Sequence, residues 1–306
     1  MKLKHIISAR QFDRKILEKI FALTNQIKAG KYKNDALYGK IMATLFYEPS
    51  TRTRFSFESA MQRLGGRVIS TENAGEFSSA AKGETLEDTI RVVNSYCDVI
   101  VLRHPKTGAS EIASQYSQVP IINAGDGEGE HPTQAILDIY TIFSKFNKKT
   151  FTVAMVGDLK YGRTVHSLSC LLALYPNVKI VFISPKALSL PKSVLDHLRK
   201  KHVDFVGTED FRSYLSVVDI LYQTLIQKER FGDIREYRKY YGKFIIDKKV
   251  LSFLKKTAVI MHPLPRVNEI TPEVDLDPRA IYFEQAQNGI FSRMALLLLL
   301  FDKAKL

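Results

Sequence analysis

The segment IMATLFYEPSTRTRFSFESAMQRL, residues Ile41–Leu64, carries the pattern from which the fold can be predicted. Its first six residues, Ile41–Phe46, are largely apolar on both faces, which is typical of a parallel strand covered by helices on both sides. After a polar stretch, Phe55–Leu64 is predicted to form a helix. A buried strand followed by a helix is the repeating unit of an α/β fold.

The same alternation continues in two rounds, separated by the polar and basic linker Asn147–Thr150. We therefore predict an α/β protein of two doubly wound domains, each with a mostly parallel sheet flanked by helices. Further strands are expected at Val68–Ser70, Val99–Leu102, Pro120–Asn123, Phe151–Val156, Val178–Ile183, Val203–Val206, Ile220–Tyr222, Val259–Met261 and Ile281–Phe283. Further helices are expected from Ser8 or Asp13 to Gly30 and at Leu86–Tyr96, Pro132–Phe146, Thr164–Leu174, Lys192–Lys201 and Gln287–Lys303.

Length and composition narrow the class of protein. The 306 residues suggest two domains at roughly 150 residues each, and 45% hydrophobic residues argue against a disordered chain. The longest apolar run, Ala295–Phe301, is too short to span a membrane, and we expect no signal peptide. Cys97 and Cys170 cannot form a multi-cysteine zinc site or a disulfide framework, so we expect reduced cysteines in a cytoplasmic protein.

The net charge of the chain indicates what kind of molecule it binds. Against 32 Asp and Glu residues stand 45 Lys and Arg residues, a net charge of +13. This leaves two interpretations, a nucleic-acid surface or a basic surface around a pocket for small anions. The basic residues are scattered, and the sequence has no zinc finger, basic zipper or ribonucleoprotein motif. We therefore favour a small anionic ligand and expect neither nucleic acid nor a membrane as partner.

The polar stretch after the first strand is suited to hold an anion. Ser50, Thr51 and Thr53 supply three hydroxyl groups, and Arg52 and Arg54 supply two guanidinium groups. Free N–H groups and the helix dipole favour an anion at a helix N-terminus, and arginine binds phosphate oxygens in a bidentate manner. The alternative is an ordinary helix cap with solvent-facing arginines.

A glycine-containing loop at Gly157–Thr164 is a weaker signal. It has the spacing of a Walker-type loop, but Arg163 stands where that motif requires lysine. The loop also lacks the GxGxxG pattern of dinucleotide sites, so nucleotide binding is poorly supported.

Four motifs together resemble one enzyme family. They are FYEPSTRTRFSFE at Phe46–Glu58, VLRHP at Val101–Pro105, EHPTQAILD at Glu130–Asp138 and HPLPR at His262–Arg266. In this order, over nearly the whole chain, they resemble the transcarbamoylases, and Pro263 is typical of the aspartate carbamoyltransferase branch rather than the ornithine branch. The resemblance implies transfer of the carbamoyl group of carbamoyl phosphate to L-aspartate in pyrimidine biosynthesis, with no metal or organic cofactor.

The resemblance also implies a division of labour between the domains. Residues 1–131 would bind carbamoyl phosphate and residues 132–285 would bind aspartate, with the C-terminal helix at 286–306 packed back onto the first domain. The catalytic chain would form a homotrimer with shared active sites, because Ser78 and Lys82 match residues that reach into a neighbouring subunit. Whether a regulatory chain binds is left open.

Roles for individual residues follow from the same resemblance. Thr53, Arg103 and His131 would polarise the carbonyl group as negative charge develops on its oxygen, and Lys82 would add positive charge against the leaving phosphate. An amine attacks this carbonyl and phosphate departs well, so positioning and fixed positive charge can supply most of the rate. The implied carbamoyl-phosphate site comprises Ser50, Thr51, Arg52, Thr53, Ser78, Lys82, Arg103, His131, Gln134, Leu264 and Pro265. The implied aspartate site comprises Lys82, Arg163 and Gln227, and Glu48 and Arg230 would hold the closed form.

One position departs from the family pattern. In DILYQTLIQKERF, residues Asp219–Phe231, the family normally has an arginine where Leu225 stands, and that arginine helps to bind the side-chain carboxylate of aspartate. Losing a charge-assisted contact weakens binding roughly 10-fold or more. Three explanations stay open. Lys82, Lys228 or Arg266 takes the carboxylate, the acceptor is a different amine, or the chain is an attenuated or non-catalytic paralogue that binds carbamoyl phosphate.

Overall fold

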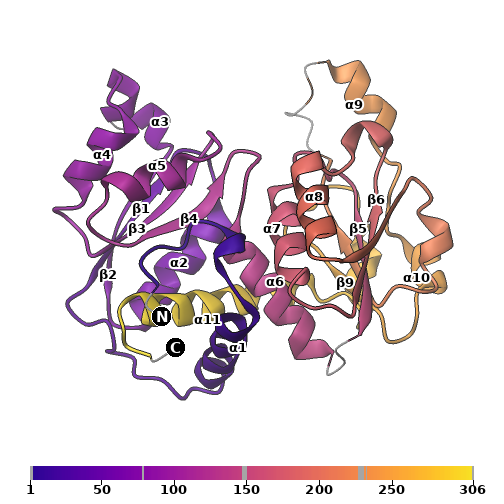
Figure 1. Ribbon diagram of the computed structural model, residues 1–306, viewed down its shortest axis with the longest axis horizontal. Helices are drawn as coiled ribbons and strands as arrows, with labels where there is room; N and C mark the ends of the chain where they lie inside the picture. The colour runs from indigo at the N-terminus through magenta and orange to yellow at the C-terminus, as the bar shows by residue number, and fades with distance from the viewer. Residues whose placement is uncertain (1–2, 78, 147–149, 227–230, 232, 305–306) are drawn as a thin grey trace. The chain divides into compact units, whose positions relative to one another are not determined.

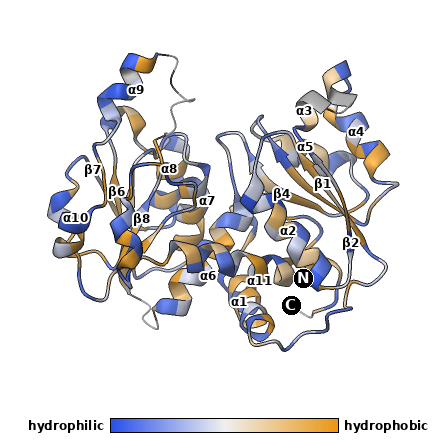
Figure 2. Cartoon of the chain, turned by 180° about the vertical axis from the view of Figure 1, so that it is seen from behind, coloured by the Kyte–Doolittle hydropathy of each residue, from blue (hydrophilic) through white to orange (hydrophobic). Residues whose placement is uncertain are grey.

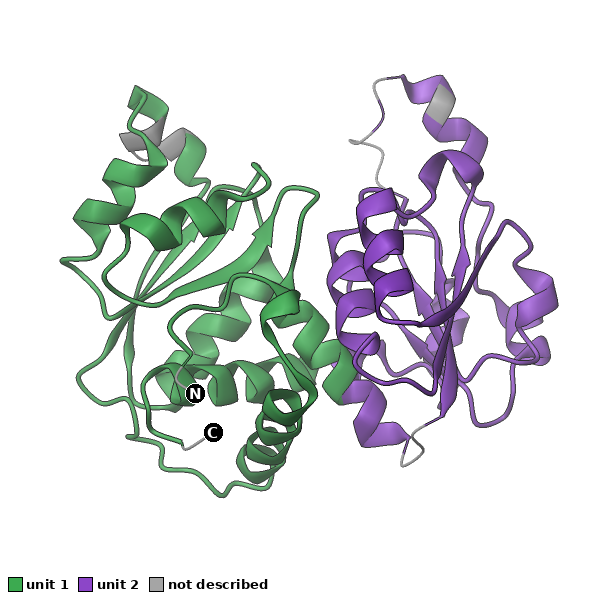
Figure 3. Ribbon diagram, viewed as in Figure 1, with its two compact units in different colours: residues 1–140, 287–306 green, residues 141–286 purple. Residues whose placement is uncertain are grey.

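The computed structural model describes residues 3–77, 79–146, 150–226, 231 and 233–304. The chain divides into two compact units, residues 1–140 with 287–306 and residues 141–286 (Figure 3). Each unit has one parallel sheet with helices packed against it (Figure 1). The prediction of a two-domain α/β protein with parallel sheets is therefore confirmed.

The sheet of unit 1 has the strand order β2-β1-β3-β4, and every pair in it is parallel. Phe46, the last residue of β1, lies opposite Arg103 on β3. Because the strands run the same way, the loops that follow β1, β3 and β4 leave the sheet at one edge. The strands are β1 (Ile41–Phe46), β2 (Arg67–Glu72), β3 (Val99–His104) and β4 (Ile121–Asp126).

Helices cover both faces of this sheet (Figure 1). On one face, Ile90 and Ala113, from α4 and α5, share a buried cluster with Leu45 and Leu102 of the sheet. The helix α2 follows β1 directly and packs on β1 and β2. The helical elements of unit 1 are η1 (Ala9–Gln11), α1 (Arg14–Lys28), α2 (Thr51–Arg63), α3 (Ala74–Phe77), η2 (Ser79–Lys82), α4 (Leu86–Val93), α5 (Ala109–Tyr116) and parts of α6 (Pro132–Lys145) and α11 (Tyr282–Leu300).

Unit 2 contains a five-stranded parallel sheet of order β7-β6-β5-β8-β9. Its strands are β5 (Phe151–Val156), β6 (Val178–Ile183), β7 (Asp204–Thr208), β8 (Ile220–Gln223) and β9 (Val259–Met261). Its helices are α7 (Arg163–Leu172), η3 (Lys186–Leu188), α8 (Lys192–Lys200), η4 (Arg212–Tyr214), α9 (Ile234–Tyr240), α10 (Lys248–Phe253) and η6 (Pro272–Leu276), together with the remaining parts of α6 and α11.

Several elements differ from the prediction. The helix α11 begins at Tyr282 rather than Gln287, and α4 ends at Val93 rather than Tyr96. The first predicted helix is split, because Ser8 caps η1 and Asp13 separately caps α1. The helix α2 begins at Thr51 rather than Phe55, because its first turn is made of the polar residues that follow Ser50. The expected strand at Ile281–Phe283 is wrong, since only an isolated bridge joins Ala280 to Ile260 before α11 begins.

The hydrophobic residues gather on the strands and on the inward faces of the helices (Figure 2). The second half of α11 is buried on all sides, which explains the apolar run in the C-terminal sequence.

No helix among the described residues is both long and apolar enough to cross a membrane. Both cysteines are free thiols, and burial raises the pKa of Cys97 to about 11.

Candidate active site

The first part of the site is the N-terminus of α2. Ser50 is the cap residue, and within the described chain its side chain makes no capping hydrogen bond to the first turn. Thr51 and Arg52 are exposed and Thr53 is buried. Partial burial lowers the pKa of Arg52 from its ordinary value. The first turn therefore offers N–H groups, hydroxyl groups and one exposed guanidinium to an anion.

Arg54 has a different role from the one its place in the motif suggests. Its Nη2 atom pairs with Glu72 at 2.9 Å, and its Nη1 atom donates to Ser70 at 3.2 Å and lies 3.6 Å from Glu58. These contacts tie α2 to the edge strand β2. Of the two guanidinium groups predicted for an anion, Arg52 alone stays exposed.

Two more predicted residues lie at the same sheet edge. Arg103, the second-last residue of β3, lies beside the chain that leaves β1, and its Nε atom lies 3.5 Å from the Glu48 carboxylate. Its Nη1 atom also donates to the carbonyl oxygen of Ala124 at 3.4 Å. His131 is buried directly before α6, after the loop that leaves β4. Parallel pairing thus brings the loops that carry Ser50, Arg103 and His131 to one edge of unit 1.

Gln134 is buried in the first turn of α6. Its Nε2 atom donates to Oδ1 of Asp138 at 2.9 Å.

Lys82 lies exposed on η2, which packs against α3 and α4. Ser78 lies outside the described residues.

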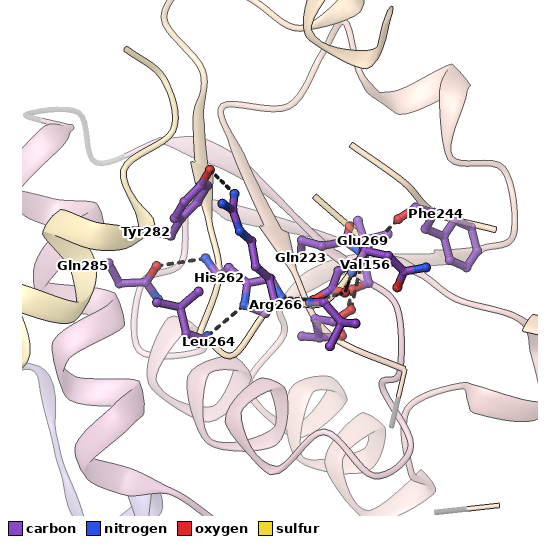
Figure 4. Close-up of polar contacts among 12 residues, drawn as sticks. Val156, Gln223, Phe244, His262, Leu264, Arg266, Glu269, Tyr282 and Gln285 are labelled. Atoms are coloured by element: carbon purple, nitrogen blue, oxygen red, sulfur yellow. Dashed lines mark hydrogen bonds and ion pairs between the residues drawn. The ribbon is translucent and has the colours of Figure 1, made fainter. Parts of the chain in front are cut away.

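In unit 2, the loop after β9 is held by a buried pair of side chains (Figure 4). The Nδ1 atom of His262 accepts a hydrogen bond from the Leu264 N–H at 2.8 Å, so the ring proton must be on Nε2. That atom lies 2.7 Å from Glu269, which also accepts the N–H groups of Val267 and Asn268 at 3.1 Å.

The ionisation of Glu269 reflects these contacts. Burial, the largest single effect, raises its pKa, but the hydrogen bond from His262 together with backbone N–H groups holds the pKa below its ordinary value. A buried carboxylate with three donors orders the backbone of residues 262–269, which includes the carbonyl groups of Leu264 and Pro265.

Arg266, in the same loop, is already engaged (Figure 4). It pairs with the Asp275 carboxylate through both terminal nitrogens, and Nη1 also contacts the Tyr282 hydroxyl at 2.8 Å. The Asp275 hydrogen bond raises the pKa of Arg266, and the same bond lowers the pKa of Asp275. Arg266 is therefore poorly placed to take the side-chain carboxylate of an acceptor.

The remaining acceptor-site predictions lie at the carboxyl ends of β5 and β8, which are adjacent strands. Arg163 is the first residue of α7, and Asp158 orders the loop before it by accepting the N–H groups of Lys160 and Tyr161. Leu225 follows β8 and is half-buried. Gln227, Lys228 and Arg230 lie outside the described residues.

Leu225 lines a mostly apolar hollow in unit 2. Its apolar lining residues are Leu225, Ile226, Tyr237, Tyr241, Phe244 and Ile245. Gln223, also in the lining, is buried, and among the described residues its Oε1 atom has no hydrogen-bond partner, while Nε2 donates to the carbonyl oxygen of Phe244 at 3.1 Å. The substitution thus sits in surroundings that suit a leucine side chain.

Sequence reasoning missed several residues that support the site. Asp138 lies within a quoted motif, four residues after Gln134, which is the spacing of neighbours on a helix. Glu269 lies three residues beyond the HPLPR motif and had no distinguishing local signal. In the part of the chain that the structure describes, no three His, Cys, Asp or Glu side chains gather as metal ligands would.

Comparisons with known proteins agree with this arrangement. Models of the carbamoyl-phosphate-binding domain and of the aspartate/ornithine-binding domain of the aspartate/ornithine carbamoyltransferases match residues 4–144 and 149–300. The chain is 54% identical over 303 residues to the chloroplastic aspartate carbamoyltransferase of Arabidopsis thaliana, covering 97% of this chain and 78% of that protein.

Solved structures are similar over the same extent. The catalytic subunit of M. jannaschii aspartate transcarbamoylase has 48% identity and a TM-score of 0.89, covering 98% of this chain and 99% of that one. The Trypanosoma cruzi aspartate transcarbamoylase in complex with carbamoyl phosphate and aspartate has 43% identity and a TM-score of 0.90, covering 97% and 96%. Together with the four motifs, these matches over nearly its whole length show that the chain belongs to the aspartate/ornithine carbamoyltransferase family.

Proposed function

We propose that this chain transfers the carbamoyl group of carbamoyl phosphate to the amino group of L-aspartate, giving N-carbamoyl-L-aspartate and phosphate for pyrimidine biosynthesis. The observation that carries the proposal is the meeting of the α2 N-terminus, Arg103 and His131 at one sheet edge. Relatives with the name aspartate carbamoyltransferase, and the T. cruzi enzyme solved with carbamoyl phosphate and aspartate, support the same reaction.

The phosphate group binds at the start of α2. The N–H groups of the first turn carry partial positive charge, and the hydroxyl groups of Ser50, Thr51 and Thr53 add donors. Arg52 supplies the full positive charge. Glu48 holds the Arg103 guanidinium at the end of β3, where it bridges the phosphate and the carbonyl oxygen.

The carbonyl group is activated by fixed donors. Thr53, Arg103 and His131 stabilise the negative charge that develops on the carbonyl oxygen when the amine attacks, and no covalent nucleophile is needed. Gln134 and the backbone carbonyl groups of Leu264 and Pro265 accept hydrogen bonds from the carbamoyl NH₂. The pair of His262 and Glu269 keeps those two carbonyl groups in place.

The acceptor binds through unit 2. Arg163, at the N-terminus of α7, holds the α-carboxylate of aspartate, with Gln227 as a further contact. With Leu225 in the position of the usual arginine, the side-chain carboxylate relies on other cations. Arg266 is already paired with Asp275. Of the three cations expected from the sequence, Lys82 and Lys228 therefore remain to bind the side-chain carboxylate. Aspartate binding is correspondingly weaker than in a chain with arginine at this position.

We also propose a homotrimer with shared active sites. Lys82 is exposed on η2, where a second subunit could be reached, and Ser78 lies in the same segment. The two free cysteines suit a reducing cytoplasm.

The proposed reaction is tested by measuring carbamoyl-aspartate formation over a wide range of L-aspartate concentrations. We expect saturable turnover, and we expect Arg52→Ala to raise the KM for carbamoyl phosphate about 10- to 100-fold, since charge-assisted hydrogen bonds contribute about 1.5–3 kcal/mol. Arg63→Ala, on the last turn of the same helix, is the control, because Arg63 contacts only Ser59 among the contacts given for it. Phosphate release that is independent of aspartate would contradict the proposal.

Leu225→Arg tests the weakened acceptor site. The new guanidinium should lower the KM for aspartate about tenfold or more, through one charge-assisted contact, and leave the KM for carbamoyl phosphate unchanged. Ile226→Arg places the same charge one residue away in the same hollow and should not lower the KM for aspartate. An unchanged aspartate KM in Leu225→Arg would show that another cation already fills this role.

Glu269→Gln tests whether the Glu269 carboxylate orders the loop at residues 262–269. Because the pKa of Glu269 is depressed in the folded state, its contribution to stability is present above about pH 4.5 and is lost as the pH falls through the lower folded pKa. The variant should lose about 1–3 kcal/mol of unfolding free energy at neutral pH, the typical cost of unsatisfied buried donors. It should also show a shallower acid-side decline of stability than the wild type, while Glu273→Gln, on η6, should behave like the wild type. Equal acid-side slopes would rule out this role for Glu269.

Subunit complementation tests the shared site. Lys82→Ala chains should be nearly inactive alone, and Arg52→Ala chains should be nearly inactive alone at carbamoyl phosphate concentrations far below their raised KM. After mixing under conditions that exchange subunits, some sites should combine a normal Lys82 from one chain with a normal Arg52 from another and regain activity. Mixed trimers without any regained activity would place all catalytic residues on one chain.

A further inference from the structure

A buried pair of opposite charges lies behind the anion site of unit 1. Asp138, on α6, and Arg293, on α11, are both almost completely buried. Buried charges are costly unless an opposite charge and hydrogen bonds compensate them. Neither residue belongs to the set that the sequence assigns to anion binding, so the two charges require an explanation of their own.

The first step is the contact between Asp138 and Gln134. An ionised carboxylate can only accept hydrogen bonds, so the Gln134 atom 2.9 Å from Oδ1 of Asp138 must be the amide nitrogen. This fixes the orientation of the side-chain amide, which is otherwise free to exchange its two ends. The carbonyl oxygen of Gln134 is then directed away from Asp138 and is available as an acceptor.

The second step is the counter-charge. The Arg293 guanidinium lies 4.9 Å from the centre of the Phe57 ring on α2. Space for it exists because residue 289 is glycine: a Cβ atom there would lie 2.3 Å from Nη1 of Arg293 and 3.1 Å from Cδ2 of Leu137, the neighbour of Asp138. In the yellow C-terminal helix of Figure 1, Gly289 and Arg293 therefore lie against α6.

Electrostatics agree with this geometry. Burial lowers the pKa of Arg293 to about 10, and the charge of Asp138 acts in the opposite direction and keeps the guanidinium protonated. The attraction between the two opposite charges is mutual, and an ionised Asp138 is the form that accepts the hydrogen bond of Gln134. A protonated Asp138 could instead donate a hydrogen bond.

We propose that Asp138 and Arg293 are positioning residues that hold Gln134 with its carbonyl oxygen toward the NH₂ group of carbamoyl phosphate. The inference rests on the proposed function, in which Gln134 contacts that NH₂ group. Its consequence is selectivity for a carbamoyl donor over an acyl donor that lacks N–H groups. If Asp138 is protonated, the Gln134 amide turns round and presents its own NH₂, which cannot accept from the donor's NH₂.

The experiment compares two ligands that share the phosphate and the carbonyl group. Carbamoyl phosphate carries NH₂ where acetyl phosphate carries CH₃. Calorimetric binding of each to the full-length chain gives a preference ratio for each variant. We expect Arg293→Met to weaken carbamoyl phosphate about tenfold and to change acetyl phosphate and inorganic phosphate by less than about twofold, because only the NH₂ contact is lost.

Three further variants distinguish the proposed role from a general packing defect. Asp138→Asn combined with Arg293→Met removes both charges and restores an acceptor for Gln134, so it should regain most of the lost preference. Arg293→Lys keeps the charge and should keep the preference, even if Arg293→Met folds poorly. Ser292→Ala, a buried change on the same turn of α11 at a residue that bonds only its own helix among the contacts given for it, should leave the ratio unchanged.

Each outcome is decisive. An equal loss for carbamoyl phosphate and acetyl phosphate in Arg293→Met, without recovery in the double variant, would reduce the pair to a structural role and overturn the inference. An unchanged ratio in folded Arg293→Met, or the absence of any preference in the wild type, would also overturn it. A wild type that does not bind carbamoyl phosphate at all would instead refute the proposed function.

Discussion

The parallel pairing of β1 with β3 is the interaction on which the site depends. It sets Phe46 opposite Arg103, so the chain that leaves β1 toward the α2 N-terminus starts beside this arginine near the end of β3. The pairing of β3 with β4 brings the segment before α6 to the same edge. The backbone hydrogen bonds of the sheet thus bring the N-terminus of a helix, hydroxyl groups and guanidinium groups together, although these groups come from segments far apart in the sequence. Preorganised donors of this kind need no rearrangement when charge develops on a substrate.

Much of this arrangement could be predicted from the sequence, because buried parallel strands are apolar on both faces and polar residues cluster just beyond them. The α2 start at Thr51 was missed because its first turn is polar and shows no helical periodicity. The Ile281–Phe283 triplet was misassigned because a short apolar run does not distinguish a strand from a buried helix start. The contacts of Arg54 with Glu72 and of Arg293 with the Phe57 ring join residues that only the folded chain brings together.

The two units differ in how completely the family pattern is preserved. Unit 1 carries most of the residues that the resemblance assigns to phosphate and carbonyl recognition, and unit 2 carries Leu264 and Pro265. Unit 2 has Arg163 at a helix N-terminus but Leu225 in an apolar hollow, while Asp275 holds Arg266. The residues proposed for the first substrate thus lie mainly in unit 1 and those proposed for the second mainly in unit 2, with Lys82 proposed for both.

The position of α11 has a consequence for biosynthesis. Unit 2 is made of one continuous stretch, residues 141–286, whereas unit 1 needs residues 287–306 to complete its core. The end of α11 is buried on all sides there, and Gly289 and Arg293 fill the space beside α6 and Phe57. Because the ribosome releases residues 287–306 after residues 141–286, unit 1 completes its core only once the whole of unit 2 has been synthesised. The unit that begins second in the sequence can thus complete its fold first, during translation.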